Sequence, residues 1–477
     1  MDQKQFGVEI TAGPQNWAIL QQQDGFTVIS LSGSWRLTAD VMPNYAQVFV
    51  RVMSEEDGSE IITYMPCSML SEQKWSVTLD KVPAGGLYRI ETSLQIDDNP
   101  AKEWNVRGDM IHHIGVGDLW VIAGQSNAAG YGKGPFNDPP AIGIHLLRNS
   151  GQWDLASHPF NDSTKSIHLE NSEQGNPGHS PFLAFAKMVR KETGYPIGLV
   201  QTALGGSPLS AWNPDENGVL YRNMMQIVQS VGRRVKGVLW YQGCSDCAPE
   251  ESQTYMARFK RVVEAWRSDL SDTLLPVLTV QLNRYTAVQD TPAHSQPNSP
   301  IISSWGTLRE TQRKAALEIP NVYVIPALDC PLSDEIHNSP AGNMLIGERL
   351  AKIALAEVYG AQVHHRAPNL SAASLGDVTV EGQSTIHLKF ENVYGYLITI
   401  GPKEDVFAAE DTIGRIEITQ WKIISKTEIQ LVLARKPEGK TLVHGAYETN
   451  PAYFLPLDTG TYMPMLGFYG VEVSNFK

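Results

Sequence analysis

A short polar run after a predicted buried strand places a serine where a nucleophile could act. Val121-Ile122-Ala123 is apolar and follows the turn-like Gly117-Asp118, which is typical of a buried strand. The run ends at Gly124, and Gln125-Ser126-Asn127 comes next. Ligands of open α/β sheets bind beyond the carboxyl ends of the strands, so Ser126 could attack a substrate there. On its own, such a serine more often turns the chain or caps a helix.

Two further segments could stabilise negative charge beside that serine. The predicted strand 197–201 leads to Gly205-Gly206, and paired glycines allow backbone N–H groups to approach a developing oxyanion closely. A third apolar run ends at Gln242, whose side-chain NH₂ could donate to the same oxyanion. Taken singly, the glycines are more often a turn, and Gln242 could bond a neighbouring loop. Trp212 is likewise more often a packing residue than a platform for a sugar.

A fourth segment contains residues that could transfer a proton. Asp334 and His337 are separated by two residues, in a loop before the predicted helix that starts at Ala341. On a tight turn the carboxylate can lie beside the imidazole and orient it toward a serine. One Asp-x-x-His is a weak signal. Four segments of this kind in one α/β region together predict nucleophilic hydrolysis by a serine.

Composition limits the class of protein. The chain has 477 residues, which predicts two or three domains, with 42% hydrophobic and 19% charged residues, typical of a globular protein. The net charge of −13 comes without a basic block, which argues against nucleic acid or an anionic membrane as the main partner. No apolar run approaches the roughly 18–20 residues of a membrane span.

Neither the cysteines nor the first residues indicate a special compartment. Four cysteines in this length form no disulfide framework, and Cys244 and Cys247 lack the second pair of a zinc site. We interpret them as two thiols near a pocket, and we expect no metal. Residues 1–7 lack the basic start and apolar middle of a secretory signal. We therefore expect a cytoplasmic protein, or a secreted or periplasmic one where a signal peptide has been removed.

The hydrophobic pattern divides the chain into three predicted domains. Residues 1–112 alternate short β-rich runs with turns, which predicts an immunoglobulin-like β-sandwich. Residues 113–362 alternate strands and helices, which predicts an α/β domain with three layers and a mostly parallel sheet. Residues 363–477 return to β patterns and predict a second β-sandwich. The strands expected in the central domain are 119–123, 197–201, 237–241, 276–281 and 322–326.

The four segments, taken together, resemble the SGNH hydrolases and, more narrowly, the sialate O-acetylesterase branch that is related to acetylxylan esterases. The resemblance extends to residues 115–120, 281–282 and 305–312, and more loosely to residues 82–88 in the N-terminal region. It implies a flavodoxin-like central domain. The matching motifs are Gly124-Gln125-Ser126-Asn127, Gly205-Gly206-Ser207 with Trp212, Trp240-Tyr241-Gln242-Gly243, and Asp334-x-x-His337.

The resemblance implies a role for each site residue. Ser126 would be the nucleophile, His337 the general base and acid, and Asp334 the residue that orients the histidine. The oxyanion hole would be formed by the backbone N–H groups of Ser126 and Gly206 and the side chain of Gln242. The residues expected to bind substrate are Gln125, Asn127, Trp212 and Arg309.

Three positions depart from the family pattern. Cys244 stands where glutamate usually follows Tyr-Gln-Gly, and Asn338 stands where proline usually follows the histidine. Many relatives also carry an acid two places before the histidine, where Glu335 stands, so Glu335 competes with Asp334 for the third place in the triad.

These observations predict a serine esterase that removes O-acetyl groups from a carbohydrate without a metal or organic cofactor. Sialate 9-O-acetylesterase is the first choice, because the likeness extends along most of the chain. An acidic sugar needs a cation near the pocket, and Arg309 lies one helical turn from Trp305. Alternatively, Arg309 pairs with Glu310 or Glu335 and supports its helix. The other functions left open are an esterase of acetylxylan or another acetylated glycan, and a sugar-binding protein without catalysis; the oligomeric state stays unknown.

Overall fold

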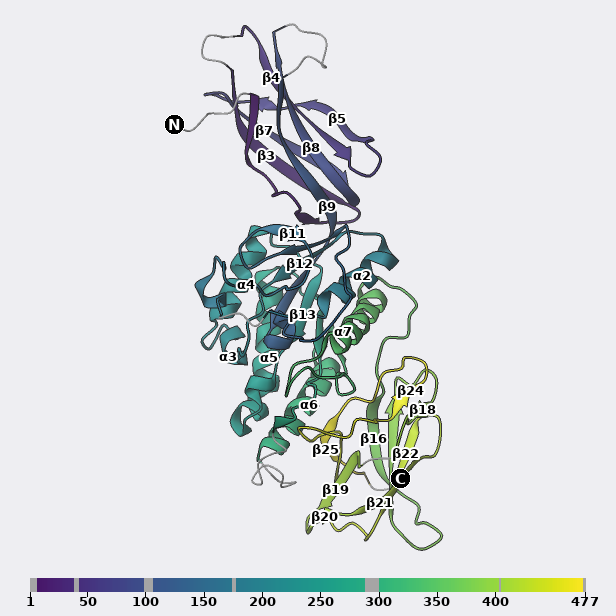
Figure 1. Ribbon diagram of the computed structural model, residues 1–477. Helices are drawn as coiled ribbons and strands as arrows, with labels where there is room; N and C mark the ends of the chain where they lie inside the picture. The colour runs from purple at the N-terminus through teal and green to yellow at the C-terminus, as the bar shows by residue number, and fades with distance from the viewer. Residues whose placement is uncertain are drawn as a thin grey trace.

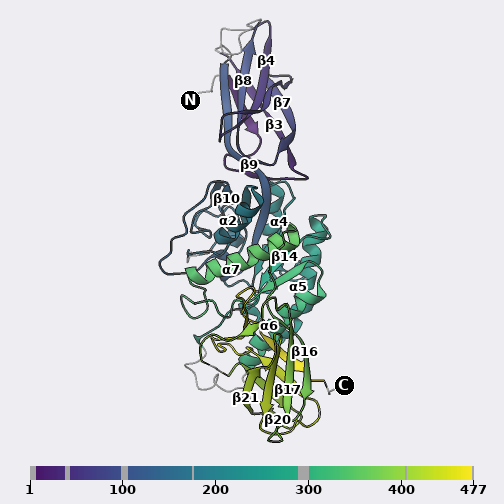
Figure 2. The same ribbon diagram turned by 90° about the vertical axis from the view of Figure 1, so that its right-hand side faces the viewer.

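The computed structural model describes residues 7–37, 43–97, 106–173, 177–287, 300–402 and 405–474. The molecule is elongated, with antiparallel β-structure at each end and a mixed α/β part between them (Figures 1 and 2). The mixed α/β class with a mostly parallel central sheet and additional antiparallel sheets is confirmed. No helix among these residues is long and apolar enough to cross a membrane.

The N-terminal part consists of two groups of antiparallel strands. One sheet has the order β1 (Gly7–Ala12), β3 (Phe26–Arg36), β7 (Lys74–Pro83) and β6 (Ser68–Met69). The second group pairs β5 (Glu60–Pro66), β4 (Ala46–Ser54), β8 (Gly85–Ile96) and the start of β9 (Val106–Gly124). Val48, Val50 and Val52 alternate along β4 and are fully buried, so one face of this strand belongs to the core. The immunoglobulin-like sandwich itself stays a prediction.

Strand β9 joins the N-terminal part to the central sheet. Its first half pairs with β8 in antiparallel fashion and with the short β2 (Ile19–Gln21), and its second half lies between β12 and β13 in parallel. The boundary predicted between residues 112 and 113 therefore falls inside one continuous strand. Because β9 ends at Gly124, the N-terminal part and the segment of Ser126 are fixed to the same strand.

The central sheet is parallel except at one edge. Its strand order is β11 (Trp153–Leu155), β10 (Ile144–Leu147), β12 (Ile197–Gln201), β9, β13 (Gly237–Tyr241), β14 (Val277–Val280) and β15 (Val322–Ile325). Only β11 is antiparallel to its neighbour. The apolar runs predicted four of these strands to within two residues at either end, and also the C-terminal part of β9. They did not predict β10 or β11, two short strands at one side of the sheet, of which β11 forms the edge.

Helices cover both faces of this sheet. Helices α2 (Phe182–Thr193) and α7 (Pro340–Ile353) pack together on one side, and α4 (Val219–Ser230) and α5 (Pro249–Asp269) lie on the other (Figure 1). A π-helical segment, Ala354–Val358, extends α7. Helix α6 (Pro300–Glu318) packs against α5 and also against the C-terminal strand β25 (Phe468–Glu472).

The C-terminal part is entirely β-structure within its described residues. One sheet has the order β16 (Asn369–Gly376), β17 (Thr385–Glu391), β22 (Glu428–Leu433) and β21 (Ile418–Ile423). The other has the order β20 (Gly414–Ile416), β19 (Phe407–Asp411), β23 (Leu442–Gly445) and β25, and β18 (Leu397–Ile398) pairs with β24 (Leu457–Asp458). Ile386, Leu388 and Leu431 are fully buried between these strands.

Arg309 on α6 attaches the C-terminal part to the central part. Its side chain is fully buried, and its guanidinium donates to the carbonyl oxygens of Leu282 at 3.1 Å and Asn283 at 2.6 Å in the central part. It also donates to the carbonyls of residues 446–449 in the C-terminal part, including Tyr447 at 3.1 Å. Its guanidinium lies 5.3 Å from the ring centroid of Trp305, one turn away as expected.

The prediction that Arg309 binds substrate is therefore wrong. Its donors are directed at backbone carbonyls, and buried carbonyls need such partners. Pairing with Glu310 or Glu335 is not what holds it either, since Glu310 forms its ion pairs with Arg313 and Lys314.

We expect Arg309→Met to destabilise the protein without a specific effect on substrate affinity. The free energy of unfolding should fall by on the order of 3–5 kcal/mol, because several buried carbonyls lose their donor at about 1–3 kcal/mol each. Denaturant unfolding measures this loss, and Arg234→Met, at an exposed arginine, is the matched control. A variant of unchanged stability with a raised KM would restore the substrate-binding role.

Candidate active site

Ser126, His337 and Asp334 form a continuous chain of hydrogen bonds. Ser126 opens the short helix α1 (Ser126–Ala129) directly after β9, and its Oγ lies 2.9 Å from His337 Nε2. His337 Nδ1 lies 2.7 Å from Asp334 Oδ2. With a proton on Nδ1, the imidazole presents an unprotonated Nε2 to the serine hydroxyl, as proton removal requires. The structure thus brings together the three residues predicted as the triad.

A glycine before the serine allows the strand to turn sharply. Gly124 has a φ of 124°, and a Cβ there would lie 2.3 Å from the carbonyl oxygen of Tyr241 on the neighbouring strand. Any other residue would therefore push β9 away from β13. The close approach lets the segment that follows, including Ser126, lie over the carboxyl ends of both strands.

The carboxylate of Asp334 is held by the backbone of its own turn. Its Oδ1 accepts the N–H groups of Ile336 at 2.9 Å and His337 at 2.8 Å. Burial opposes ionisation of Asp334, but these hydrogen bonds and the imidazole outweigh it and lower the pKa of its carboxyl. The alternative acid, Glu335, is exposed, and its backbone carbonyl accepts the N–H of Thr286. Geometry therefore favours Asp334 over Glu335 as the partner of His337.

Asn127, predicted to bind substrate, instead joins the serine segment to the histidine loop. Its side chain is 3% exposed, and its Oδ1 accepts the backbone N–H of Asn338 at 3.0 Å. Its Nδ2 donates to the carbonyl of Ile336 at 3.2 Å. Asn338 also donates from its side chain to Tyr241 Oη at 3.1 Å. Asn127 and Asn338 therefore hold the histidine loop in place by hydrogen bonds.

The two backbone donors predicted for an oxyanion hole have no hydrogen-bond partner among the described residues. Gly206 has a φ of 64°, and a Cβ at this position would meet no atom within 4 Å. Within the described part of the chain, no hydrogen bond engages the N–H of Gly206 or of Ser126. Both donors therefore remain available to a developing negative charge.

Gln242, the third predicted donor, does not point into this space. It is fully buried, and its Nε2 donates to Asp246 Oδ2 at 2.6 Å and to the carbonyl of Ser207 at 3.2 Å. Its Oε1 accepts the hydroxyl of Tyr255 at 2.7 Å. The geometry therefore does not support a side-chain oxyanion donor at Gln242. Instead, Gln242 braces the loop that carries Gly206.

Two other predicted substrate residues also have structural contacts. Gln125 is 4% exposed, and its Oε1 accepts the N–H groups of Gly243 at 3.0 Å and Ser245 at 3.4 Å. Trp212 is fully buried, and its indole N–H donates to Ser207 Oγ at 3.0 Å. Its ring packs edge-on against Trp240 at 5.3 Å, so it offers no face to a sugar. The packing interpretation of Trp212 is the correct one.

Two residues at the site were not predicted from the sequence. The ring of Tyr131 lies 5.1 Å from that of His337. Glu173 Oε2 accepts the N–H of Gly205 at 3.2 Å, directly before Gly206. Neither residue lies in a strand-end segment, and the sequences of the loops that contain them show no hydrophobic periodicity or motif that would have predicted a role.

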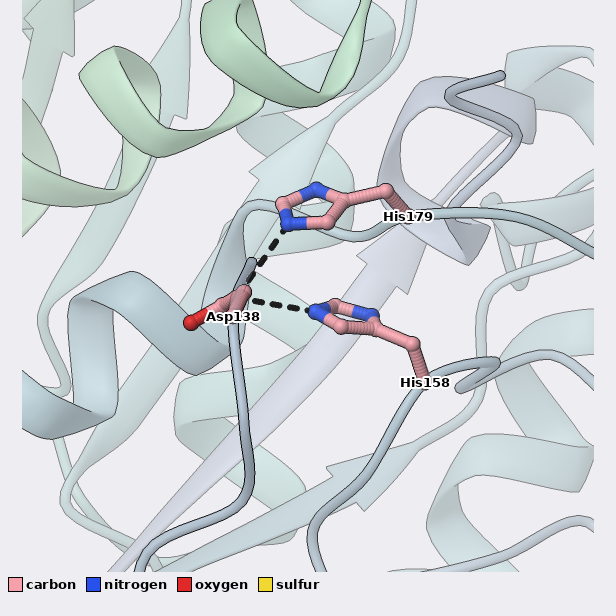
Figure 3. A group of neighbouring side chains, drawn as sticks. All are labelled: Asp138, His158 and His179. Atoms are coloured by element: carbon pink, nitrogen blue, oxygen red, sulfur yellow. Dashed lines mark hydrogen bonds and ion pairs between the residues drawn. The ribbon is translucent and has the colours of Figure 1, made fainter. Parts of the chain in front are cut away.

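One group of side chains has the composition of a metal site. Asp138, His158 and His179 lie together, with potential ligand atoms within 4.8 Å of one another (Figure 3). Asp138 Oδ2 lies 3.0 Å from His158 Nε2 and 3.2 Å from His179 Nε2, and its Oδ1 accepts the ammonium of Lys187 at 2.5 Å. All three donors thus converge on one carboxylate, whose side chain is 3% exposed.

The hydrogen bonds of this group fit a clamp better than a metal site. A metal-bound imidazole usually donates its second N–H to an acceptor. His158 Nδ1 instead accepts the backbone N–H of Ser180 at 3.3 Å, so the proton of neutral His158 lies on Nε2 and points at Asp138. Burial opposes ionisation of Asp138, but the donors from His158, His179 and Lys187 hold its pKa far below the usual range. The clamp fixes the loop that begins at Tyr131.

The four cysteines are free thiols. Cys244 begins a short 3₁₀ turn, Cys244–Asp246, after β13. Burial raises the pKa of its thiol to about 12, so it is not a reactive thiolate at neutral pH.

A serine at a strand end, joined through histidine to an ionised aspartate and placed beside free backbone donors, has the geometry of a serine hydrolase. Residues 116–356 match the family described as carbohydrate esterase, sialic acid-specific acetylesterase. This match covers half of the chain, so the protein belongs to that family. It is a carbohydrate esterase, which confirms the predicted enzyme class.

Individual relatives are distant. The chain is 29% identical to a probable carbohydrate esterase of Arabidopsis thaliana over 50% of this chain and 90% of the relative. It is 23% identical to the sialate O-acetylesterase of Homo sapiens over 60% of this chain, but this spans only 61% of the human protein. A carbohydrate acetylesterase from Xanthomonas citri has a similar fold over 95% of this chain and 97% of its own, with a TM-score of 0.62 and 21% identity.

We expect Asp138→Asn to destabilise the protein in a pH-dependent way. Because the folded-state pKa of Asp138 is depressed, its ionised form stabilises the fold above the unfolded pKa of about 3.9, and this stabilisation is lost as the pH falls. The variant should lose roughly 2–4 kcal/mol of unfolding free energy at pH 7. The difference from wild type should shrink between pH 5 and pH 3.

Thermal unfolding across this pH range measures the effect. Asp154→Asn, at an exposed aspartate, is the control. Destabilisation of the wild type by a chelator, absent in Asp138→Asn, would contradict the clamp and favour a metal ion.

Proposed function

We propose that this protein is an O-acetylesterase that releases acetate from an acetylated sugar through an acetyl-enzyme on Ser126. His337 Nε2 takes the hydroxyl proton while Oγ forms a bond to the acetyl carbonyl carbon. The tetrahedral intermediate collapses, the bond to the sugar oxygen breaks, and that oxygen receives the proton from Nε2. A water molecule, activated in the same way, then releases acetate and restores the serine. The hydrogen-bonded chain from Ser126 to Asp334 carries this proposal.

The negative charge of each tetrahedral intermediate would be stabilised by backbone groups. The N–H groups of Ser126 and Gly206 have no protein partner among the described residues, and the space beside Gly206 is open. Such preorganised donors stabilise a transition state more than a ground state, because the oxygen gains charge only on attack.

The sugar is the finer part of the proposal. The family description and the sialate O-acetylesterases among the relatives support an O-acetylated sialic acid, of which the 9-O-acetyl form was the predicted one. An acidic sugar nevertheless needs a cation, and Arg309, which was expected to supply it, donates to backbone carbonyls instead. This observation favours the alternative, a neutral acetylated glycan such as acetylxylan.

Ser126→Ala should abolish acetyl release while the protein stays folded. Loss of a triad nucleophile removes about 10⁴–10⁶ of kcat. Acetate release from a chromogenic acetate ester gives the rate, and a circular dichroism melt reports the fold. Labelling by a serine-directed phosphonate should map to Ser126 in the wild type. Near-normal turnover by the folded variant would end the proposal, including its acetyl-enzyme.

A screen of acetylated sugars should separate the candidate substrates. We expect acetate release from acetylated xylo-oligosaccharides or other neutral acetylated glycans to exceed that from 9-O-acetyl sialic acid at equal concentration. Ser126→Ala is the blank for each substrate. A strong preference for the sialic acid would contradict the neutral-glycan proposal and favour the substrate named in the family description, but it would not contradict the esterase mechanism.

A further inference from the structure

The carboxylate of Glu173 lies beside the proposed oxyanion donors. Its Oε2 accepts the N–H of Gly205 at 3.2 Å, and the next residue along the chain is Gly206. The backbone of Glu173 is itself fixed, since Ser163 Oγ donates to its carbonyl at 3.1 Å and accepts its N–H at 3.2 Å. Ser163 is 2% exposed. A buried hydroxyl therefore positions the acid against the oxyanion loop.

Glu173 also holds the tyrosine that packs on the catalytic histidine. A Cβ on Gly205 would lie 2.3 Å from Tyr131 Oη and 2.4 Å from Glu173 Oε2, so both atoms occupy the space beside this glycine. Burial raises the pKa of the Tyr131 hydroxyl, and its hydrogen bond to Glu173 raises that pKa further. The phenol therefore stays protonated and donates to the carboxylate, while its ring lies 5.1 Å from that of His337.

We propose that Glu173 is a positioning and specificity-determining residue, which fixes the Gly205–Gly206 turn and Tyr131 and discriminates against acetylated sugars that carry a carboxylate. This inference rests on the proposed esterase function and specifies its substrate class. Glu173 is partly exposed and sits one residue from an oxyanion donor. Like charges still repel within a Debye length of about 8 Å, so a substrate carboxylate that lies this close to Glu173 would be disfavoured.

A matched substrate pair isolates the charge effect. We would measure kcat/KM for an O-acetylated sialic acid and for its methyl ester, which differ only in the carboxylate charge. The wild type should prefer the methyl ester. Glu173→Gln keeps a carbonyl oxygen for Gly205 and Tyr131 but removes the charge, so the preference should fall about two- to fivefold, the size of a partly exposed charge interaction.

Two further variants separate positioning from charge. Glu173→Ala removes the acceptor as well, and should lower kcat on a neutral chromogenic acetate at least about tenfold, as loss of alignment at an oxyanion donor does. Glu173→Gln should retain most of that kcat, which is a rescue that a general folding defect would not give. Glu170→Gln removes an equal charge from the same exposed segment and should leave both the kcat and the preference unchanged.

Each outcome decides one point. A preference that is equal in wild type, Glu173→Gln and Glu170→Gln would overturn the role of the charge, as would a wild-type preference for the free acid. Equal kcat in Glu173→Ala and wild type would overturn the positioning role. If the wild type hydrolyses neither sugar nor the chromogenic acetate, the esterase proposal fails instead.

Discussion

The amide side chain of Asn127 is the contact on which the geometry of the site depends. The serine and the histidine are 211 residues apart in sequence, and the hydrogen bond between them is 2.9 Å long. Asn127 sits next to the serine and binds the backbone on both sides of the histidine, at Ile336 and Asn338. Because one planar group both donates and accepts, the two segments cannot slide past each other without breaking both bonds.

Side-chain amides at other strand ends of the central sheet also hold neighbouring loops in place. Gln125 after β9, Gln242 after β13 and Gln281 after β14 are each buried and bonded to backbone groups of neighbouring loops. Backbone groups beyond the edge of a sheet have lost their ladder partners, and leaving them unpaired in a buried place is costly. Side-chain amides satisfy them. Gln281 extends this to the C-terminal part, where it donates to the carbonyl of Gly467.

A side-chain amide at a strand end can bind either a ligand or the backbone of a loop, and this explains where prediction from the sequence succeeded and failed. Buried parallel strands have continuous apolar runs, so β12 and β13 were predicted to the residue, and the end of β9, just before Ser126, was predicted to within one residue. The sequence of a glutamine after such a strand is the same whether its side chain faces a ligand or a neighbouring loop. For this reason the sequence predicted Gln242 as an oxyanion donor, whereas its amide binds a neighbouring loop. The prediction for Arg309 failed for a related reason, since four of the carbonyls that accept from it, those of residues 446–449, lie 137 residues or more away in the sequence.

The site also depends on how strongly each carboxylate is buried. Asp138 is nearly inaccessible and needs three donors to stay ionised, so its hydrogen bonds are fully used in holding the loop of Tyr131. Asp334 keeps 42% of its side chain exposed and is ionised with only the help of its own turn and His337. A carboxylate at the surface costs less to keep charged, because water still solvates it. The charge of Asp334 can therefore stabilise the imidazolium that forms when His337 takes the serine proton. Asp138 could not do so, because its carboxylate already accepts from His158, His179 and Lys187.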